Sequence, residues 1–273
     1  DAIGPKYGVS KNAVYQALTR RGVKTRTPHE ATIGRRQPHR SALMRKYHVP
    51  NARIFQNINT EEKAYWLGFL MADGNVMVYV DGHRRHVLNL SLAESDRSHV
   101  EAFRDFLGVT NPLKEVPGKK GRQQTSVRVQ IACEPMVEDL IACGCVPRKT
   151  YGMEYPFNAV PWTLNRHFIR GYFDGDGTVT RHHAARKNAK VSFACSSEAF
   201  SKGIRDIFCE NGMDYVNVWK SPARLVWETT IQRQSVLPDV YHWFYDDATV
   251  FLERKKAKFE ELLGLTATAT TAD

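Results

Sequence analysis

The fold is decided by two ten-residue stretches: residues 65–74 read YWLGFLMADG, and residues 168–177 read FIRGYFDGDG. Each combines apolar residues with a glycine, a small residue four positions later, and a final Asp-Gly pair. The two final aspartates, Asp73 and Asp176, are 103 residues apart. A motif repeated at the spacing of a domain indicates a duplicated half.

The small residues of each stretch predict how the two copies meet. Residues four apart lie on one face of a helix, so Gly68 with Ala72, and Gly171 with Gly175, form two stripes without bulky side chains. We predict that the two motif helices pack against each other through these stripes. Neither apolar run reaches membrane-spanning length, so we expect the pairing inside a soluble protein and no insertion into a membrane.

The aspartates break a local rule, because the C-terminal end of a helix carries partial negative charge and favours cations. An Asp-Gly pair after one helix is typical of a helix stop or a turn. Two copies at domain spacing favour a functional site instead. Two carboxylates roughly 5 Å apart repel by about 3 kcal/mol at an effective dielectric near 20. Together with helix-end carbonyl groups, Asp73 and Asp176 are oxygen donors suited to Mg²⁺ or Ca²⁺.

The charge of the chain is uneven. Its formal net charge is +10, and residues 1–60 contain 12 Lys and Arg against two acidic residues, while the remainder contains 27 of each sign. A basic segment of this kind favours nucleic acid or an anionic membrane surface as partner. The five cysteines show no disulfide or zinc spacing, and no secretion or transit signature is seen. We therefore expect an intracellular protein, cytoplasmic or in the nucleoid.

The N-terminal residues fall into two segments. Residues 1–26 resemble a helix-turn-helix, with outward residues Lys11, Asn12, Tyr15 and Gln16 on the second helix. A small helical hairpin with a basic face is the alternative. Residues 27–50 form a basic linker. Two roles stay open for the arginines here: they contact DNA phosphates or the minor groove, or they belong to a solvated tether. These arginines are Arg26, Arg35, Arg36 and Arg40.

The remaining sequence predicts two equivalent repeats, residues 51–160 and 161–265, followed by a flexible tail over residues 266–273. In each, a motif helix precedes two strands, a helix, two strands and a helix, judged from apolar periodicity and turn signals. The fold class is therefore α+β. We expect two pseudo-twofold-related αββαββα repeats, each with a four-stranded antiparallel sheet, plus the small N-terminal helical segment.

Polar, basic and aromatic residues occupy the strand positions that need not face the core. A twisted antiparallel sheet with such a face can lie in a DNA major groove and read base edges, although solvated loops account for some of these residues. The candidates are Tyr79, His83, Arg84, Arg85, His86, Arg122, Gln124, Arg128 and Gln130 in the first repeat, and Arg181, His183, Arg186, Lys187, Lys190, Lys220, Arg224 and Gln232 in the second.

The two motifs, their spacing and the repeated order of elements resemble the LAGLIDADG homing endonucleases in their single-chain, two-repeat form. The resemblance covers roughly residues 45–262, and the N-terminal part is similar to an appendage of some members. It implies a DNA-binding saddle in a monomer with internal pseudo-dimer symmetry. It also implies site-specific cleavage of both strands of a long double-stranded DNA target, with short 3′ overhangs, by an enzyme associated with introns or standing free.

The resemblance further assigns residues. It implies that Asp73 and Asp176 bind Mg²⁺, for which Ca²⁺ or Mn²⁺ can substitute, helped by the carbonyl groups of Ala72 and Gly175. The family usually has a lysine near each scissile phosphate, and Lys149 and Lys255 match best. Both flank predicted helix starts, so ordinary surface lysines are the alternative.

One departure from the family pattern concerns a second acidic residue, two positions before the catalytic aspartate. It is present as Asp174 but replaced by Met71 in the first copy, so the two half-sites need not be equal. An RNA maturase or a DNA-binding transcription regulator on the same fold is the alternative function. Such proteins commonly lose the acidic pair, so its presence in both repeats favours the nuclease.

Overall fold

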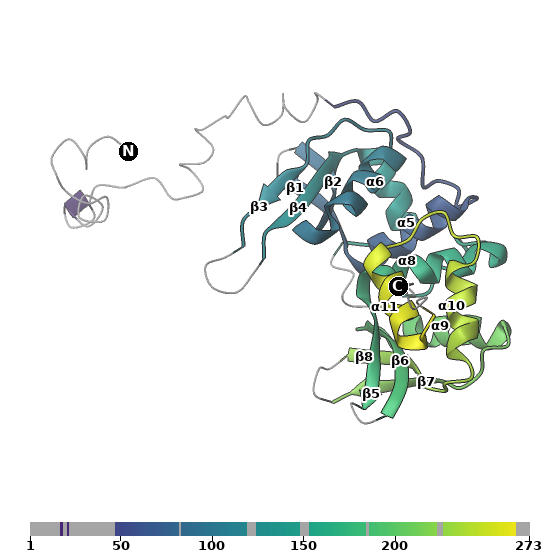
Figure 1. The fold of residues 1–273 in the computed structure, drawn as a ribbon. Helices are drawn as coiled ribbons and strands as arrows, with labels where there is room; N and C mark the ends of the chain where they lie inside the picture. Colours follow the sequence, from purple (N-terminus) through teal and green to yellow (C-terminus); the bar gives the residue numbers. More distant parts are fainter. Residues whose placement is uncertain are drawn as a thin grey trace, which may run out of the picture. The chain divides into compact units, whose positions relative to one another are not determined.

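The computed structural model describes residues 17–18, 21, 47–81, 83–118, 124–147, 153–183, 186–222 and 226–265, with backbone alone at 80, 81, 83, 84, 182, 183 and 186–188. The chain divides into two units, Asp1–Lys46 and Tyr47–Asp273. Everything below concerns the second unit (Figure 1). The predicted helix-turn-helix contacts, Arg26, Arg35, Arg36 and Arg40, and Lys149, Arg122 and Arg224 lie outside the described residues.

The two repeats share the order helix, two strands, helix, two strands and helix, which confirms the predicted α+β class. The first contains α5 (Glu61–Ala72), β1 (Gly74–Asp81), β2 (His83–Ala93), a 3₁₀ turn (Glu94–Asp96), α6 (Arg97–Phe106), β3 (Lys114–Val116), β4 (Ser126–Ala132) and α7 (Glu134–Ala142). The second contains a 3₁₀ turn (Trp162–Leu164), α8 (Asn165–Asp176), β5 (Gly177–His183), β6 (Arg186–Cys195), α9 (Glu198–Glu210), β7 (Val216–Ser221), β8 (Val226–Ile231), α10 (Leu237–Tyr245) and α11 (Glu253–Leu263). Helix α11 is additional to the predicted αββαββα order, and its first turn contains Lys255, near which a helix start was predicted.

Each repeat forms one four-stranded antiparallel sheet. The strand orders are β1-β2-β4-β3 and β5-β6-β8-β7, so equivalent strands hold equivalent places. Along β4, Val127, Val129 and Ile131 are fully buried, whereas Arg128 and Gln130 between them are partly exposed. This period-two pattern shows that one face of the sheet packs on the helices and the other is open.

Helix α5 begins at an N-cap, because the Thr60 hydroxyl accepts a hydrogen bond from the Lys63 backbone N–H at 3.3 Å. Residues 64–72 are all buried, so the helix lies inside the protein on every side. It packs along α8, and the pair lies between the two sheets (Figure 1). Among the described residues, none of the helices has the length and apolar character needed to cross a bilayer.

Candidate active site

The contact between α5 and α8 depends on two glycines. A Cβ atom on Gly68 would lie 2.0 Å from the backbone oxygen of Phe168, and one on Gly171 would lie 2.0 Å from that of Tyr65. Because residues 65 and 168 hold equivalent places in the two motifs, the contact is reciprocal and defines a local twofold relation. A Cβ on Gly175 would lie 2.4 Å from the Ala72 methyl group. The small-residue stripes of the two motifs therefore face each other.

This packing brings the two motif aspartates to the same end of the helix pair. Asp73 follows α5 directly, Asp176 is the last residue of α8, and both are exposed. The Asp73 Oδ2 atom lies 3.4 Å from the position that a Cβ on Gly175 would take. Both carboxylates also lie close enough to act on the same two buried groups. Their negative charges raise the pKa of Tyr172, and they partly counter the burial that lowers the pKa of Lys255. Asp73 and Asp176 thus converge.

The glycines that follow the aspartates have a steric role. Gly74 and Gly177 follow the helices as predicted, but neither has the positive φ common in glycines at helix ends. Each begins a strand that leaves directly from the last helical turn. A Cβ would lie 2.6 Å from the Leu70 oxygen at Gly74, and 2.2 Å from a ring carbon of Phe173 at Gly177. Any larger residue would push the strand away from the helix.

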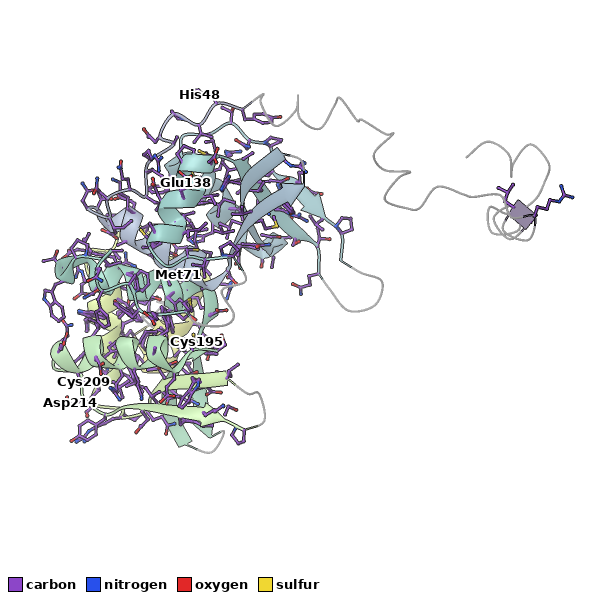
Figure 2. The ribbon with its side chains drawn as sticks, turned by 180° about the vertical axis from the view of Figure 1, so that it is seen from behind. His48, Met71, Glu138, Cys195, Cys209 and Asp214 are labelled. Carbon is purple, nitrogen blue, oxygen red and sulfur yellow. The ribbon has the colours of Figure 1, made fainter. Side chains whose placement is uncertain are left out.

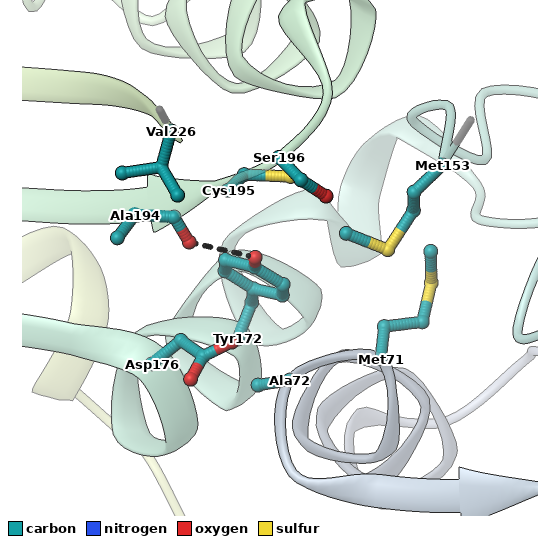
Figure 3. Close-up of a pocket in the computed structure, with 9 residues that line it drawn as sticks. All are labelled: Met71, Ala72, Met153, Tyr172, Asp176, Ala194, Cys195, Ser196 and Val226. Carbon is teal, nitrogen blue, oxygen red and sulfur yellow. Dashed lines mark hydrogen bonds between the residues drawn. The ribbon is translucent and has the colours of Figure 1, made fainter. Parts of the chain in front are cut away.

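A cavity of about 270 Å³ opens beside Asp176 (Figure 3). Met71 and Met153 point toward each other across one side of it. The Tyr172 hydroxyl donates to the Ala194 carbonyl oxygen at 3.1 Å on the other side. The residues that line the cavity are Met71, Ala72, Met153, Tyr172, Asp176, Ala194, Cys195, Ser196 and Val226.

Lys255 lies beneath the end of α8. Its side chain, in the first turn of α11, is buried, and its ammonium group donates to the carbonyl oxygens of Phe173, at 3.4 Å, and Gly177. Burial and the nearby Arg254 lower the pKa of the ammonium group. A cation at this place complements the partial negative charge of the helix end. Its predicted role at a scissile phosphate stays a prediction.

The donor set at the helix ends fits a hard divalent cation. The carboxylates of Asp73 and Asp176 and the last-turn carbonyl groups of Ala72 and Gly175 are all oxygen donors, the type that Mg²⁺, Ca²⁺ and Mn²⁺ prefer. Both aspartates are exposed, so water can complete the coordination that Mg²⁺ usually retains. The buried thiols and thioethers nearby are the wrong chemistry for these ions.

The open face of the first sheet carries several of the predicted contact residues. Tyr79 is paired with Arg85 across β1 and β2, with the guanidinium 5.8 Å from the ring centre, while Arg128 and Gln130 lie on β4. All four alternate with core residues and point away from the helices. Lys190 lies on the open face of the second sheet, 3.6 Å from Glu228, and Gln232 directly follows β8.

Three predicted contacts lie on the other face. His86 is wrong as a DNA contact, because it is paired with Val78 on the helix-covered face and is buried. Arg181 is paired with the buried Ala189, and Lys220 with Trp227, which also places both on the helix side, although their ends are exposed. The reason is that neighbouring residues of a strand point to opposite faces of the sheet. The residues of a continuous basic run therefore cannot all lie on the DNA-facing side.

The remaining strand candidates are incompletely defined. The structure gives only the backbone of His83, Arg84, His183, Arg186 and Lys187. Gln124 is exposed in the segment that leads into β4. Their contacts stay predictions.

Sequence reasoning missed a buried polar network behind the aspartates. Arg170 is fully buried and donates to Glu61 at 2.7 Å and to the backbone oxygens of Phe244 and Val250 at 2.7 and 3.1 Å. Asp174, one turn along α8, accepts from the Tyr65 hydroxyl at 2.8 Å and from the Leu252 backbone N–H at 2.7 Å. The signal was present in the sequence, since Arg170 and Asp174 interrupt an apolar helix four residues apart.

Comparisons with known proteins found one family model and a set of solved structures that resemble this chain. A family model described as a LAGLIDADG-like domain matches residues 163–216. The LAGLIDADG meganuclease I-AabMI, solved bound to uncleaved DNA, is 12% identical, with 74% of this chain and 90% of that chain covered and a TM-score of 0.50. A mutant of I-SmaMI is 11% identical over 74% and 89%, with a TM-score of 0.50. I-DmoI in complex with DNA and Mn is 13% identical over 71% and 98%, with a TM-score of 0.46.

No curated protein matches the chain in sequence. At identities this low, the similarity to solved structures shows the fold alone. The family model matches part of the sequence of the second repeat. Residues 163–216 therefore match a LAGLIDADG-like domain, and the chain shares the fold of the LAGLIDADG meganucleases.

Proposed function

We propose that this protein is a site-specific endonuclease that hydrolyses both strands of a long double-stranded DNA target with a divalent cation, leaving short 3′ overhangs. The observation that carries the proposal is the convergence of Asp73 and Asp176 at one end of the α5–α8 pair, between two sheets with polar open faces. A metal centre between two base-reading surfaces is the arrangement that such a reaction needs.

The open faces supply the DNA contacts in this proposal. Arg85 and Arg128 are suited to guanine edges or phosphates, and Gln130 to adenine. The excess positive charge of residues 1–60 adds sequence-independent attraction to the DNA backbone. The I-AabMI meganuclease, whose structure was solved on DNA, has the same fold.

The chemistry rests on the aspartates and their support. Asp73 and Asp176, with the carbonyl groups of Ala72 and Gly175, hold the cation, which when bound supplies Lewis-acid stabilisation of charge at the phosphate. Lys255 acts from beneath, where its buried charge offsets the two carboxylates and holds the end of α8 in place. The local twofold relation of the helices gives each repeat access to one strand of a duplex, whose two backbones are also related by twofold symmetry.

The test is selection of cleaved sequences from a randomised duplex library. We expect a defined set of cut sites in Mg²⁺ or Mn²⁺ and none in EDTA. Combined D73N and D176N substitutions should lower the cleavage rate at least about a thousandfold, whereas the exposed Asp246→Asn control should cut normally. Undiminished cutting by the double variant would refute the metal site. Specific binding of DNA or intron RNA without any cut would instead favour a regulator or a maturase.

A further inference from the structure

A second cluster of metal-ligand residues lies on the helix side of the first sheet. The His86 side chain, on β2, is 1% exposed, and its Nδ1 atom has no hydrogen-bond partner among the described residues. This atom points at the first turn of α7, 3.4 Å from a carboxylate oxygen of Glu134. Leaving a buried polar atom unpaired costs about 1–3 kcal/mol, so the position calls for a ligand.

Two carboxylates complete the cluster. Glu134 and Glu138 are one turn apart on the same side of α7, and their ligand atoms and the His86 nitrogen all lie within 4.8 Å of one another. Figure 2 labels Glu138 on this helix. Arg53 contacts Glu138 at 3.4 Å, but its shorter contact, at 2.6 Å, is to Asp139. Both glutamates are about half exposed, which leaves their side chains free to turn toward a bound ion.

We propose that His86, Glu134 and Glu138 bind one transition-metal ion, with Zn²⁺ the best match. Zn²⁺ takes imidazole nitrogen and carboxylate oxygen as ligands, and a site with three protein ligands keeps water in the fourth position. Bonds of about 2.0 Å in a tetrahedral site place neighbouring ligand atoms about 3.3 Å apart, close to the 3.4 Å between His86 and Glu134. The nitrogen donor separates this site from the all-oxygen site at Asp73 and Asp176, which suits Mg²⁺.

The ion would connect the helix layer to the open face of the sheet. His86 is paired with Val78, and the next pair toward the β1–β2 turn is Tyr79 with Arg85, whose side chains point to the other face. A bond from β2 to α7 at His86 therefore fixes the part of the strand pair that carries Tyr79 and Arg85. This site is independent of the catalytic proposal, because it uses none of the residues of the centre at Asp73 and Asp176.

Zn²⁺ binding to the full chain tests this inference. The titration is done by competition with a chromogenic zinc chelator, in excess Mg²⁺ to occupy the carboxylate site. We expect one Zn²⁺ per chain and, in Co²⁺-substituted protein, the visible absorption of tetrahedral cobalt. His86→Gln should weaken binding at least about tenfold and abolish that absorption. The matched control is His242→Gln, which removes an exposed histidine 3.1 Å from a single carboxylate, Asp246.

Variants of the two glutamates distinguish a lost metal ligand from a folding defect. Glu134→Gln and Glu138→Gln alter half-exposed side chains, so both variants should fold and still lose Zn²⁺ affinity. Equal Zn²⁺ binding by the wild type and these variants, or no binding by the wild type, would overturn the proposal. Because the measured quantity is Zn²⁺ affinity and not DNA cleavage, this outcome is separate from that of the nuclease test.

Discussion

The two motif helices meet through equivalent glycines, yet their outer sides are built from different chemistry. Arg170 and Asp174 of α8 hold the places that Leu67 and Met71 hold in α5. Around α5, the Met71 methyl group is 3.8 Å from the position of a Cβ on Gly144, and Met71 borders the cavity with Met153. The first repeat therefore packs this side with apolar atoms.

Around α8, the same side is a buried network that crosses between the repeats. Arg170 joins Glu61 of α5 to the backbone that precedes α11, and Asp174 joins Tyr65 of α5 to the N-cap of α11 at Leu252. Burial lowers the pKa of Arg170, which the charges of Glu61 and Asp174 oppose. Both copies of the motif therefore make the close helix contact, and among the described residues it is the α8 copy that anchors α11, through Arg170 and Asp174.

Gly171→Ala should have the largest effect on stability, because it disrupts the close contact between α5 and α8 that both repeats contribute to. A new methyl group 2.0 Å from the Tyr65 oxygen must push the helices apart, and we expect a loss of about 5 kcal/mol in the free energy of unfolding, measured with urea. Gly68→Ala should cost the same. The control is Gly212→Ala, which meets no atom within 4 Å and, at φ +77°, should cost only about 1 kcal/mol. Clearly unequal costs at Gly68 and Gly171 would contradict the reciprocal contact.

Arg170→Leu disrupts the buried polar network, which only the α8 copy of the motif contributes through this position. We expect a loss of about 3 kcal/mol, because Glu61 loses its buried ion-pair partner and Asp174 loses the positive charge buried beside it. Adding Asp174→Met, which copies the first repeat, should cost less than the two single losses combined. Additive losses in this double-mutant cycle would show that the two residues act separately. Arg97→Leu is the control, since it breaks exposed ion pairs and should cost less than about 1 kcal/mol.

The network also predicts a pH dependence with two opposing parts. Burial lowers the pKa of His99 from 6.5 to about 4, so its contribution to stability is complete above pH 6.5 and is lost as the pH falls toward 4. Burial raises the pKa of Asp174 from 3.8 to about 6, so its contribution is complete below pH 3.8 and is lost as the pH rises through 6. Each effect amounts to about 1–2 kcal/mol between pH 7 and pH 5.

Two variants separate these parts. His99→Gln, which keeps a polar group for the Tyr65 hydroxyl, should lose less stability than the wild type when the pH falls from 7 to 5. Asp174→Asn should lose more, because it lacks the compensating protonation. Urea unfolding at both pH values measures the difference. Parallel behaviour of all three proteins would show that neither group titrates as its burial requires.

The sequence predicted the features that local patterns encode. The element order follows from apolar periodicity, and the placement of Asp73 and Asp176 follows from a motif written twice. Helix α11 was left out of the predicted repeat order, although a helix start was predicted beside Lys255, because only Lys255, Phe259 and Leu262 of its residues are buried and leave little apolar pattern. The partners of Arg170 and Asp174 could not be predicted, because they are backbone and side-chain groups 71–109 residues away that only the tertiary fold assembles.

The central claim is that Asp73 and Asp176, one from each repeat, form a single centre. The direct measurement is the cleavage rate of each strand of a selected duplex by Asp73→Asn and by Asp176→Asn separately. We predict that either substitution slows the cutting of both strands together, at least about a thousandfold. A variant that still nicks one strand at the wild-type rate would contradict the claim and show that each repeat works alone.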